Sequence, residues 1–140
     1  MTTNDTESRG YQFSAEDELK NAGLIRALME RDHSGGGFDV SIFHDNVRIF
    51  FDSNPGDPVR FPNNECFYGL RALAEMNQAY ADKGFTYIVE MHSVYAVGPL
   101  VIVTRTDFRK EDGQPDVAFP AVGVFAFKDG KIIEWSDYYR

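Results

Sequence analysis

The C-terminal part of the sequence holds three ionisable side chains within segments that are otherwise apolar. The segment Leu100–Phe108 is rich in β-branched residues and is bounded by turn residues, which predicts a strand. Because side chains alternate along a strand, Arg105 and Asp107 share one face. Alternation along Lys131–Tyr139 places Asp137 on a face with apolar neighbours. If both faces point inward, one guanidinium and two carboxylates meet in the core.

Such a group is costly to bury unless its members pair, because each ion loses its hydration. Two carboxylates that lie close together do not both ionise readily, so one of them can keep a proton near neutral pH. An arginine stays cationic and can hold the other carboxylate ionised. This pattern suits acid–base catalysis on a neutral substrate. The structural alternative is an ion pair of Arg105 with Asp107, with Asp137 on the surface.

Two segments resemble the limonene-1,2-epoxide hydrolase family: Thr104-Arg-Thr-Asp-Phe108 and Gly123-Val-Phe-Ala-Phe-Lys-Asp-Gly-Lys-Ile-Ile-Glu-Trp-Ser-Asp-Tyr-Tyr139. The resemblance implies a nuclear transport factor 2-like fold, which SnoaL-type polyketide cyclases and ketosteroid isomerases share. It implies that Asp137 takes a proton from water, that Asp107 protonates the epoxide oxygen and that Arg105 bridges them. A diol would form in one step without a covalent intermediate, a metal or a cofactor.

The sequence departs from that family just after the first expected strand. The family positions its water with a Tyr and an Asn before a Pro, and alignment on Pro55 places Phe51 and Ser53 there. A slip of one residue would offer Asp52 and Asn54 instead. Ser53 or Asn54 could hydrogen-bond a water, whereas Phe51 could not. Two alternatives therefore stay open: a SnoaL-type cyclase, isomerase or dehydratase acting on a polyketide or steroid-like substrate, and a ligand-binding domain without catalysis.

The chain order of the expected elements indicates an α+β fold. Helical spacing predicts helices from Ser14 to about Arg31 and over Gly69–Lys83, with a short helix over Phe38–His44 between them. A period of two predicts strands, in chain order, over Val47–Phe51, Phe85–Val97, Leu100–Phe108, Val117–Phe127 and Lys131–Tyr139. We expect a cone-shaped, curved, mixed or antiparallel sheet wrapped around about three N-terminal helices.

Side-chain periodicity also predicts which residues face inward. On the two longer helices these are Leu19, Ala22, Ile25, Leu28 or Met29, Leu70, Leu73, Met76 and Tyr80. On the strands they include Tyr87, Val89, Met91, Tyr95, Val97, Ile133, Trp135 and Tyr139, with His92 outward. We expect five residues to line a pocket: Phe51, Tyr87, Met91, Val103 and Trp135. The substrate would be a small apolar epoxide-like or polyketide-like molecule.

Composition narrows the classes of partner and the location. The chain has 140 residues, which fits a flexible arm over residues 1–12 and one domain over residues 13–140. A net charge of −8 offers no basic surface for nucleic acid, and no apolar run is long enough to span a bilayer. Cys66 is the single cysteine, and three scattered histidines give no metal-ligand spacing. These features fit a cytoplasmic protein without a metal or a membrane partner.

The face of the sheet opposite Arg105 is expected to be apolar as well. Leu100, Ile102 and Phe108 lie on it, and Val117–Phe127 is apolar on both faces. Strands that are apolar on both sides are usually covered on both sides. We therefore expect a homodimer packed through the outer sheet face, which the family resemblance also implies.

Overall fold

A computed structural model describes residues 13–30, 39–51, 66–83 and 86–139. The helical elements are α2 (Ala15–Glu30), the 3₁₀ turn η1 (Val40–Ile42) and α3 (Gly69–Lys83). The strands are β1 (Phe43–Phe51), β2 (Cys66–Tyr68), β3 (Thr86–Val97), β4 (Leu100–Lys110), β5 (Val117–Lys128) and β6 (Lys131–Tyr139). The predicted arm over residues 1–12 and the predicted water-positioning residues Ser53 and Asn54 lie outside the described residues.

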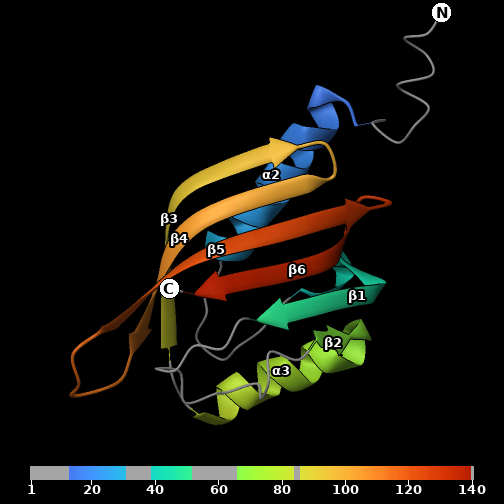
Figure 1. Ribbon diagram of the computed structural model, residues 1–140. Coiled ribbons are helices and arrows are strands. Elements are labelled where there is room, and N and C mark those ends of the chain that lie inside the picture. The colour runs from blue at the N-terminus through green and yellow to red at the C-terminus, as the bar shows by residue number, and fades with distance from the viewer. Residues whose placement is uncertain (1–12, 31–38, 52–65, 84–85, 140) are drawn as a thin grey trace, which may run out of the picture.

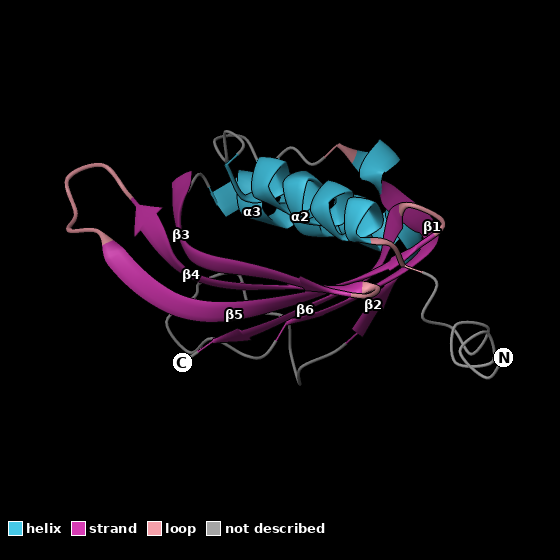
Figure 2. Cartoon of the chain, turned by 90° about the horizontal axis from the view of Figure 1, so that it is seen from above, coloured by secondary structure: helices cyan, strands magenta, loops and turns pink. Residues whose placement is uncertain are grey.

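The six strands form one sheet in the order β2-β1-β6-β5-β4-β3. Only the β1–β6 pair is parallel among these strands, so the sheet is mixed. The sheet curves strongly, and both α-helices lie against its concave side (Figures 1 and 2). The core fills the space between them. The predicted α+β cone is confirmed, although a single 3₁₀ turn replaces the short helix expected over residues 38–44.

Helix α2 begins at a capping box formed by Ser14 and Asp17. The Ser14 hydroxyl accepts a hydrogen bond from the Asp17 N–H, and the Asp17 carboxylate accepts one from the Ser14 N–H, both at 3.1 Å. Ile25, Leu28 and Met29 are buried as predicted. The prediction for Leu19 was wrong, because its side chain is 75% exposed. The polar Asn21 is buried on the inner face of the helix instead.

Strand β1 begins four residues earlier than predicted. Asp39 caps the 3₁₀ turn by accepting a hydrogen bond from the Ser41 N–H at 3.0 Å, and the backbone is extended from Phe43 onward. His44 therefore lies within β1 and not at the end of a helix. Strand β2 was not predicted. On α3, Leu73 and Met76 are buried as expected, and Leu70 is partly buried.

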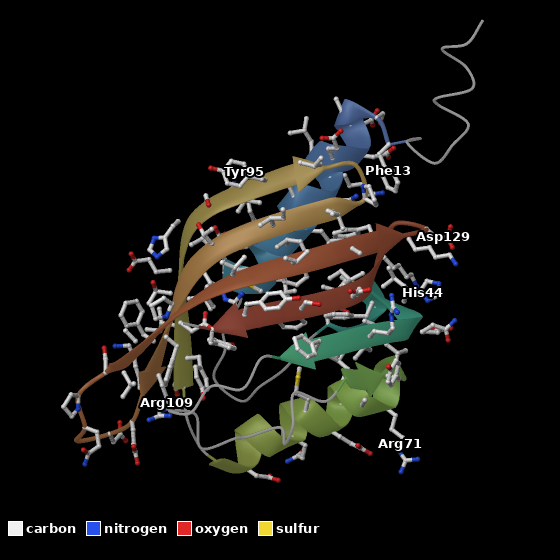
Figure 3. The ribbon with its side chains drawn as sticks, viewed as in Figure 1. Phe13, His44, Arg71, Tyr95, Arg109 and Asp129 are labelled. Carbon is white, nitrogen blue, oxygen red and sulfur yellow. The ribbon has the colours of Figure 1, made fainter. Side chains whose placement is uncertain are left out.

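A β-bulge in β3 changes which of its residues face the core. Met91 pairs with Arg105 and Ser93 pairs with Thr104, so β3 contains one extra residue at His92. The alternation moves by one position beyond it. Val94 and Ala96 then pack against the core. Tyr95, labelled in Figure 3, and Val97 were predicted to be inward but are 60% and 63% exposed.

A second bulge lies near the start of β6. Phe127 pairs with Ile132 while Ala126 pairs with Glu134, which leaves Ile133 as the extra residue. Ile132 is fully buried, so the prediction that Ile133 points into the core was wrong. Before this bulge, a tight hairpin joins β5 to β6, and Asp129 and Gly130 in its turn both have positive φ. Among the described helices, none is long and apolar enough to cross a membrane.

Candidate active site

Arg105, Asp107 and Asp137 meet on the concave face of the sheet. Arg105 donates to Asp107 through Nε at 2.8 Å and Nη2 at 3.1 Å. It donates to Asp137 through Nη2 at 2.8 Å and Nη1 at 3.0 Å. One guanidinium thus holds two carboxylates at once. Their side-chain exposures are 3% for Arg105, 12% for Asp107 and 1% for Asp137, so the predicted convergence of the three side chains is observed.

Two small residues on β5 make this convergence possible. Arg105 on β4 is the register partner of Ala121, and Asp137 on β6 is the register partner of Gly123. Strands separated by one intervening strand lie roughly 10 Å apart, so the side chains of β4 and β6 must reach over β5. A Cβ at Gly123 would lie 2.7 Å from Arg105 Nη1 and 3.0 Å from Asp137 Oδ1. Glycine is therefore the residue that leaves room for the ion pair.

Sequence reasoning did not identify this role of β5, although a signal exists. The inner positions of β5 are buried and alternate with outward ones. In order they read Phe119, Ala121, Gly123, Phe125 and Phe127. Two small residues between bulky ones mark the place where neighbouring side chains cross the strand.

Trp135 positions Asp137 and encloses it. The indole Nε1 donates to Asp137 Oδ1 at 2.8 Å. The Trp135 ring is buried, stacks on Phe43 at a centroid distance of 6.2 Å and packs against Phe125 at 5.3 Å. The expectation that Trp135 walls the acid is consistent with these contacts. The hydrogen bond adds a fixed orientation to the carboxylate.

Burial of Asp137 and its pairing with Arg105 shift the pKa of Asp137 in opposite directions. Burial raises the pKa of Asp137 above its ordinary value, and the Asp107 charge adds to this. Arg105 and the Trp135 N–H lower the pKa of Asp137 but do not cancel the effect of burial. For Arg105, burial alone would lower the pKa, but Asp137 and Asp107 outweigh it and the pKa is raised. The site therefore combines a permanent cation with a carboxylate of increased proton affinity.

Tyr139 also belongs to this cluster, on the side of Asp107. Its hydroxyl donates to Asp107 Oδ2 at 3.3 Å and accepts from Arg105 Nη2 at 3.5 Å. Its place on the inner face of β6 was predicted, but its contact with the acid was not. The sequence signal for this contact was the period of two, which places Tyr139 on the same face as Trp135 and Asp137.

The other predicted lining residues lie around the cluster to different extents. Val103 is buried on β4, and Met91 is the register partner of Arg105 and partly buried. Tyr87 pairs with Arg109, two positions along β3 from Val89, which is the register partner of Asp107. The backbone of Phe51 pairs with Asp137, which places the end of β1 beside the site.

His92 lies away from the site, as predicted. It is exposed on the outer face, and its Nε2 lies 2.8 Å from Thr106 Oγ1. Within the ranges that the structure describes, no three His, Cys, Asp or Glu side chains are grouped so that they could hold a metal ion.

Solved structures with the same fold include candidate and named enzymes. A candidate SnoaL-like polyketide cyclase from Jannaschia sp. CCS1 superposes with a TM-score of 0.68 at 21% identity, over 91% of this chain and 90% of that chain. An LEH-like epoxide hydrolase from M. tuberculosis gives 0.57 at 23% identity, over 91% and 84%. The epoxide hydrolase/cyclase-like enzyme SalBIII has a role in pyran ring formation in the polyether salinomycin. It superposes with a TM-score of 0.61 at 20% identity, over 89% of this chain and 91% of that chain.

These identities establish a shared fold and leave the reaction open. No curated protein sequence matches the chain. The family model described as a SnoaL-like domain matches residues 24–135, which run from Leu24 in α2 to Trp135 in β6. The chain therefore belongs to the SnoaL-like domain family.

Proposed function

We propose that this protein is a cofactor-independent epoxide hydrolase that adds water to a small or cyclic epoxide. Asp137 acts as the base, Asp107 as the acid, and Arg105 bridges them. The observation that carries this proposal is the simultaneous bonding of Arg105 to both carboxylates in a buried cluster. Two carboxylates held by one cation are arranged for one to hold a proton while the other accepts one.

The proposed reaction is one concerted step. A water gives a proton to Asp137 while its oxygen forms a bond to an epoxide carbon. The carbon–oxygen bond of the ring breaks, and the released oxygen takes a proton from Asp107. The product is a diol, and the proton returns from Asp137 to Asp107 through solvent after release. Each positioned proton transfer contributes about 10²–10⁴-fold to the rate.

The position of β1 supports a water site beside Asp137. Phe51, the last residue of β1, is the register partner of Asp137, so the end of this strand lies next to the proposed base. Ser53 and Asn54 come two and three residues later and carry groups that can hydrogen-bond a water. We propose them as the water-positioning residues. Once ionised, Asp137 is a stronger base than an ordinary carboxylate, because its pKa is raised.

A second candidate function is a SnoaL-type cyclase, isomerase or dehydratase that acts on a polyketide or steroid-like substrate. Phe51 favours this second function. It aligns with the tyrosine that positions water in the limonene-1,2-epoxide hydrolase family, but it has no hydroxyl group to hydrogen-bond a water. The same fold carries a candidate polyketide cyclase and an epoxide hydrolase/cyclase-like enzyme. The acid–base pair would serve this reaction without a hydrolytic water.

The first test is diol formation from limonene oxide, cyclohexene oxide and styrene oxide. We expect the wild type to form a diol from at least one of them, and Asp107→Asn and Asp137→Asn each to lose at least about 100-fold in turnover. Asp129→Asn is the matched control, because Asp129 lies in an exposed turn and asparagine tolerates its positive φ. Retained activity in either site variant would exclude the proposed roles.

We further propose that a second copy of the chain covers the outer sheet face. Tyr95, Val97, Leu100, Val122 and Tyr138 all expose apolar surface. An exposed apolar patch that extends across neighbouring strands is typical of an interface. One such face on each copy is self-complementary under a twofold axis, so a homodimer is the simplest assembly.

A further inference from the structure

The two oxygens of Asp107 are held differently. Oδ1 accepts a short hydrogen bond from Arg105 Nε at 2.8 Å. Among the residues that the structure describes, the contacts of Oδ2 are longer, 3.1 Å to Arg105 Nη2 and 3.3 Å to the Tyr139 hydroxyl. Longer hydrogen bonds are weaker, so Oδ2 is the oxygen that can exchange a partner at lower cost. The Tyr139 hydroxyl lies directly beside it.

The same side of the cluster is also its more accessible side. Asp107 has the most exposed side chain of the three ionisable residues, and Tyr139 is half-buried, whereas Asp137 and Arg105 are almost fully enclosed. Of the described residues in the cluster, Asp107 and Tyr139 are therefore the ones that a ligand atom can reach with least rearrangement.

We propose that the Tyr139 hydroxyl is a second hydrogen-bond donor to the substrate oxygen that Asp107 protonates. This inference rests on the proposed function only in placing that oxygen at Asp107 Oδ2. A substrate oxygen there lies next to the Tyr139 hydroxyl, which rotates about its C–O bond and can turn its proton from Asp107 to the substrate. Arg105 Nη2 lies 3.5 Å from the same hydroxyl oxygen, and the positive charge of the guanidinium favours donation by the tyrosine.

The role defines a class of substrate. Donation from Tyr139 is worth most when negative charge develops on the oxygen, as in the opening of an epoxide or the enolisation of a ketone. No bond to Tyr139 forms or breaks in this role, and the tyrosine keeps its proton throughout. The substrate is thus one with an oxygen that becomes anionic in the reaction, in either of the two candidate functions.

Adjacent tyrosines provide a matched pair for the kinetic test. Tyr139→Phe and Tyr138→Phe each remove one hydroxyl, but Tyr138 is 48% exposed on the outer face and packs against Phe50 at a centroid distance of 5.9 Å. We expect Tyr139→Phe to lower kcat by about tenfold or more, with KM within about twofold, because the donor acts on developing charge. Tyr138→Phe should match the wild type. An effect on KM alone, or equal kcat in both variants, would overturn the proposal.

A binding test separates this inference from the proposed function. The probe is 4-nitrophenol, whose phenol and phenolate forms absorb at different wavelengths. We expect the wild type and Tyr138→Phe to bind the phenolate equally well and Tyr139→Phe to bind it about tenfold more weakly. If no epoxide is hydrolysed but this difference is found, the hydrolase function fails and the role of Tyr139 stands. Equal binding by all three proteins, or no binding by the wild type, refutes the proposed role of Tyr139.

Discussion

Gly123 and Arg105 are in such close contact that the backbone of one residue limits the side chain of the other. A Cβ on Gly123 would lie 2.7 Å from Arg105 Nη1, which is closer than real Cβ atoms approach other heavy atoms. The contact lies on β5, halfway between the strand that carries Arg105 and the strand that carries Asp137. The absence of a side chain at residue 123 is therefore a condition for the bridged carboxylates.

Gly123→Ala should weaken both the fold and the activity. The added methyl group would displace the guanidinium and leave buried charges imperfectly paired, at a cost of about 1–3 kcal/mol in the free energy of unfolding. Turnover of the epoxide substrate should fall by about tenfold or more, because both carboxylates lose their alignment.

Gly23→Ala is the control for that substitution. Gly23 is exposed in the middle of α2, and no atom lies within 4 Å of a Cβ built there. Alanine should stabilise the helix by about 0.5–1 kcal/mol and leave turnover unchanged. Urea unfolding and steady-state kinetics on both variants check these outcomes. A Gly123→Ala protein as stable and active as the wild type would contradict the proposed steric role.

The sequence predicted both α-helices, five of the six strands and the convergence of the charges, because periodicity indicates which face of each element is buried. Arg105, Asp107 and Asp137 lie in strand segments without an extra residue among them, so alternation assigned their faces correctly. The Asp129-Gly130 pair is a sequence signal for the hairpin between β5 and β6, because its turn has positive φ at both positions.

Two local irregularities account for the wrong inward assignments on the strands. The extra residues at His92 and Ile133 each shift the alternation by one position, which exposes Tyr95 and buries Ile132. A bulge leaves no clear signal in a sequence whose side chains are apolar on both sides of it. Leu19 was misassigned because the buried face of α2 is set by Asn21, Ile25, Leu28 and Met29, and at 3.6 residues per turn Leu19 points away from that face.

Side-chain contacts between strands that are not adjacent could not be predicted, because each segment of the sequence was considered separately. The role of Gly123 depends on the register of β5 against both neighbours, and the Tyr139–Asp107 hydrogen bond spans the same two intervals. Periodicity places a residue on a face but does not say which side chains on that face meet.

The free energy of unfolding should depend on pH, because Asp137 is buried. Its folded-state pKa is raised above the value in the unfolded chain, so the folded protein binds more protons between those two values. The contribution of Asp137 to the free energy of unfolding is fully present below pH 3.8 and is lost as the pH rises through the folded pKa. The slope of this loss is at most about 1.4 kcal/mol per pH unit.

Asp137→Asn removes this titration and keeps the shape of the side chain. The stability of Asp137→Asn relative to the wild type should therefore increase as the pH rises above about 4, measured by urea unfolding across the pH range. A relative stability that falls with pH would mean that pairing with Arg105 outweighs burial, contrary to the electrostatic account.

The outer sheet face should control the oligomeric state. Light scattering at micromolar concentration should give about twice the chain mass of 15.9 kDa. Val97→Lys places a charge on that face and should produce a monomer, whereas Leu19→Lys changes an equally exposed residue on α2 and should remain dimeric. A wild-type monomer would refute the dimer, and a dimeric Val97→Lys protein would place the interface elsewhere.

A single-turnover reaction in ¹⁸O-labelled water tests the central claim most directly. Enzyme in excess over an epoxide that the screen shows to be a substrate should give a diol with one ¹⁸O atom in the first turnover, because water itself attacks the ring beside Asp137. Asp137→Asn should form this product at least about 100-fold more slowly. An unlabelled diol in the first turnover would indicate a covalent ester on a carboxylate, and an unlabelled isomer would indicate cyclase or isomerase chemistry. Either result would contradict direct hydrolysis by the Arg105, Asp107 and Asp137 cluster.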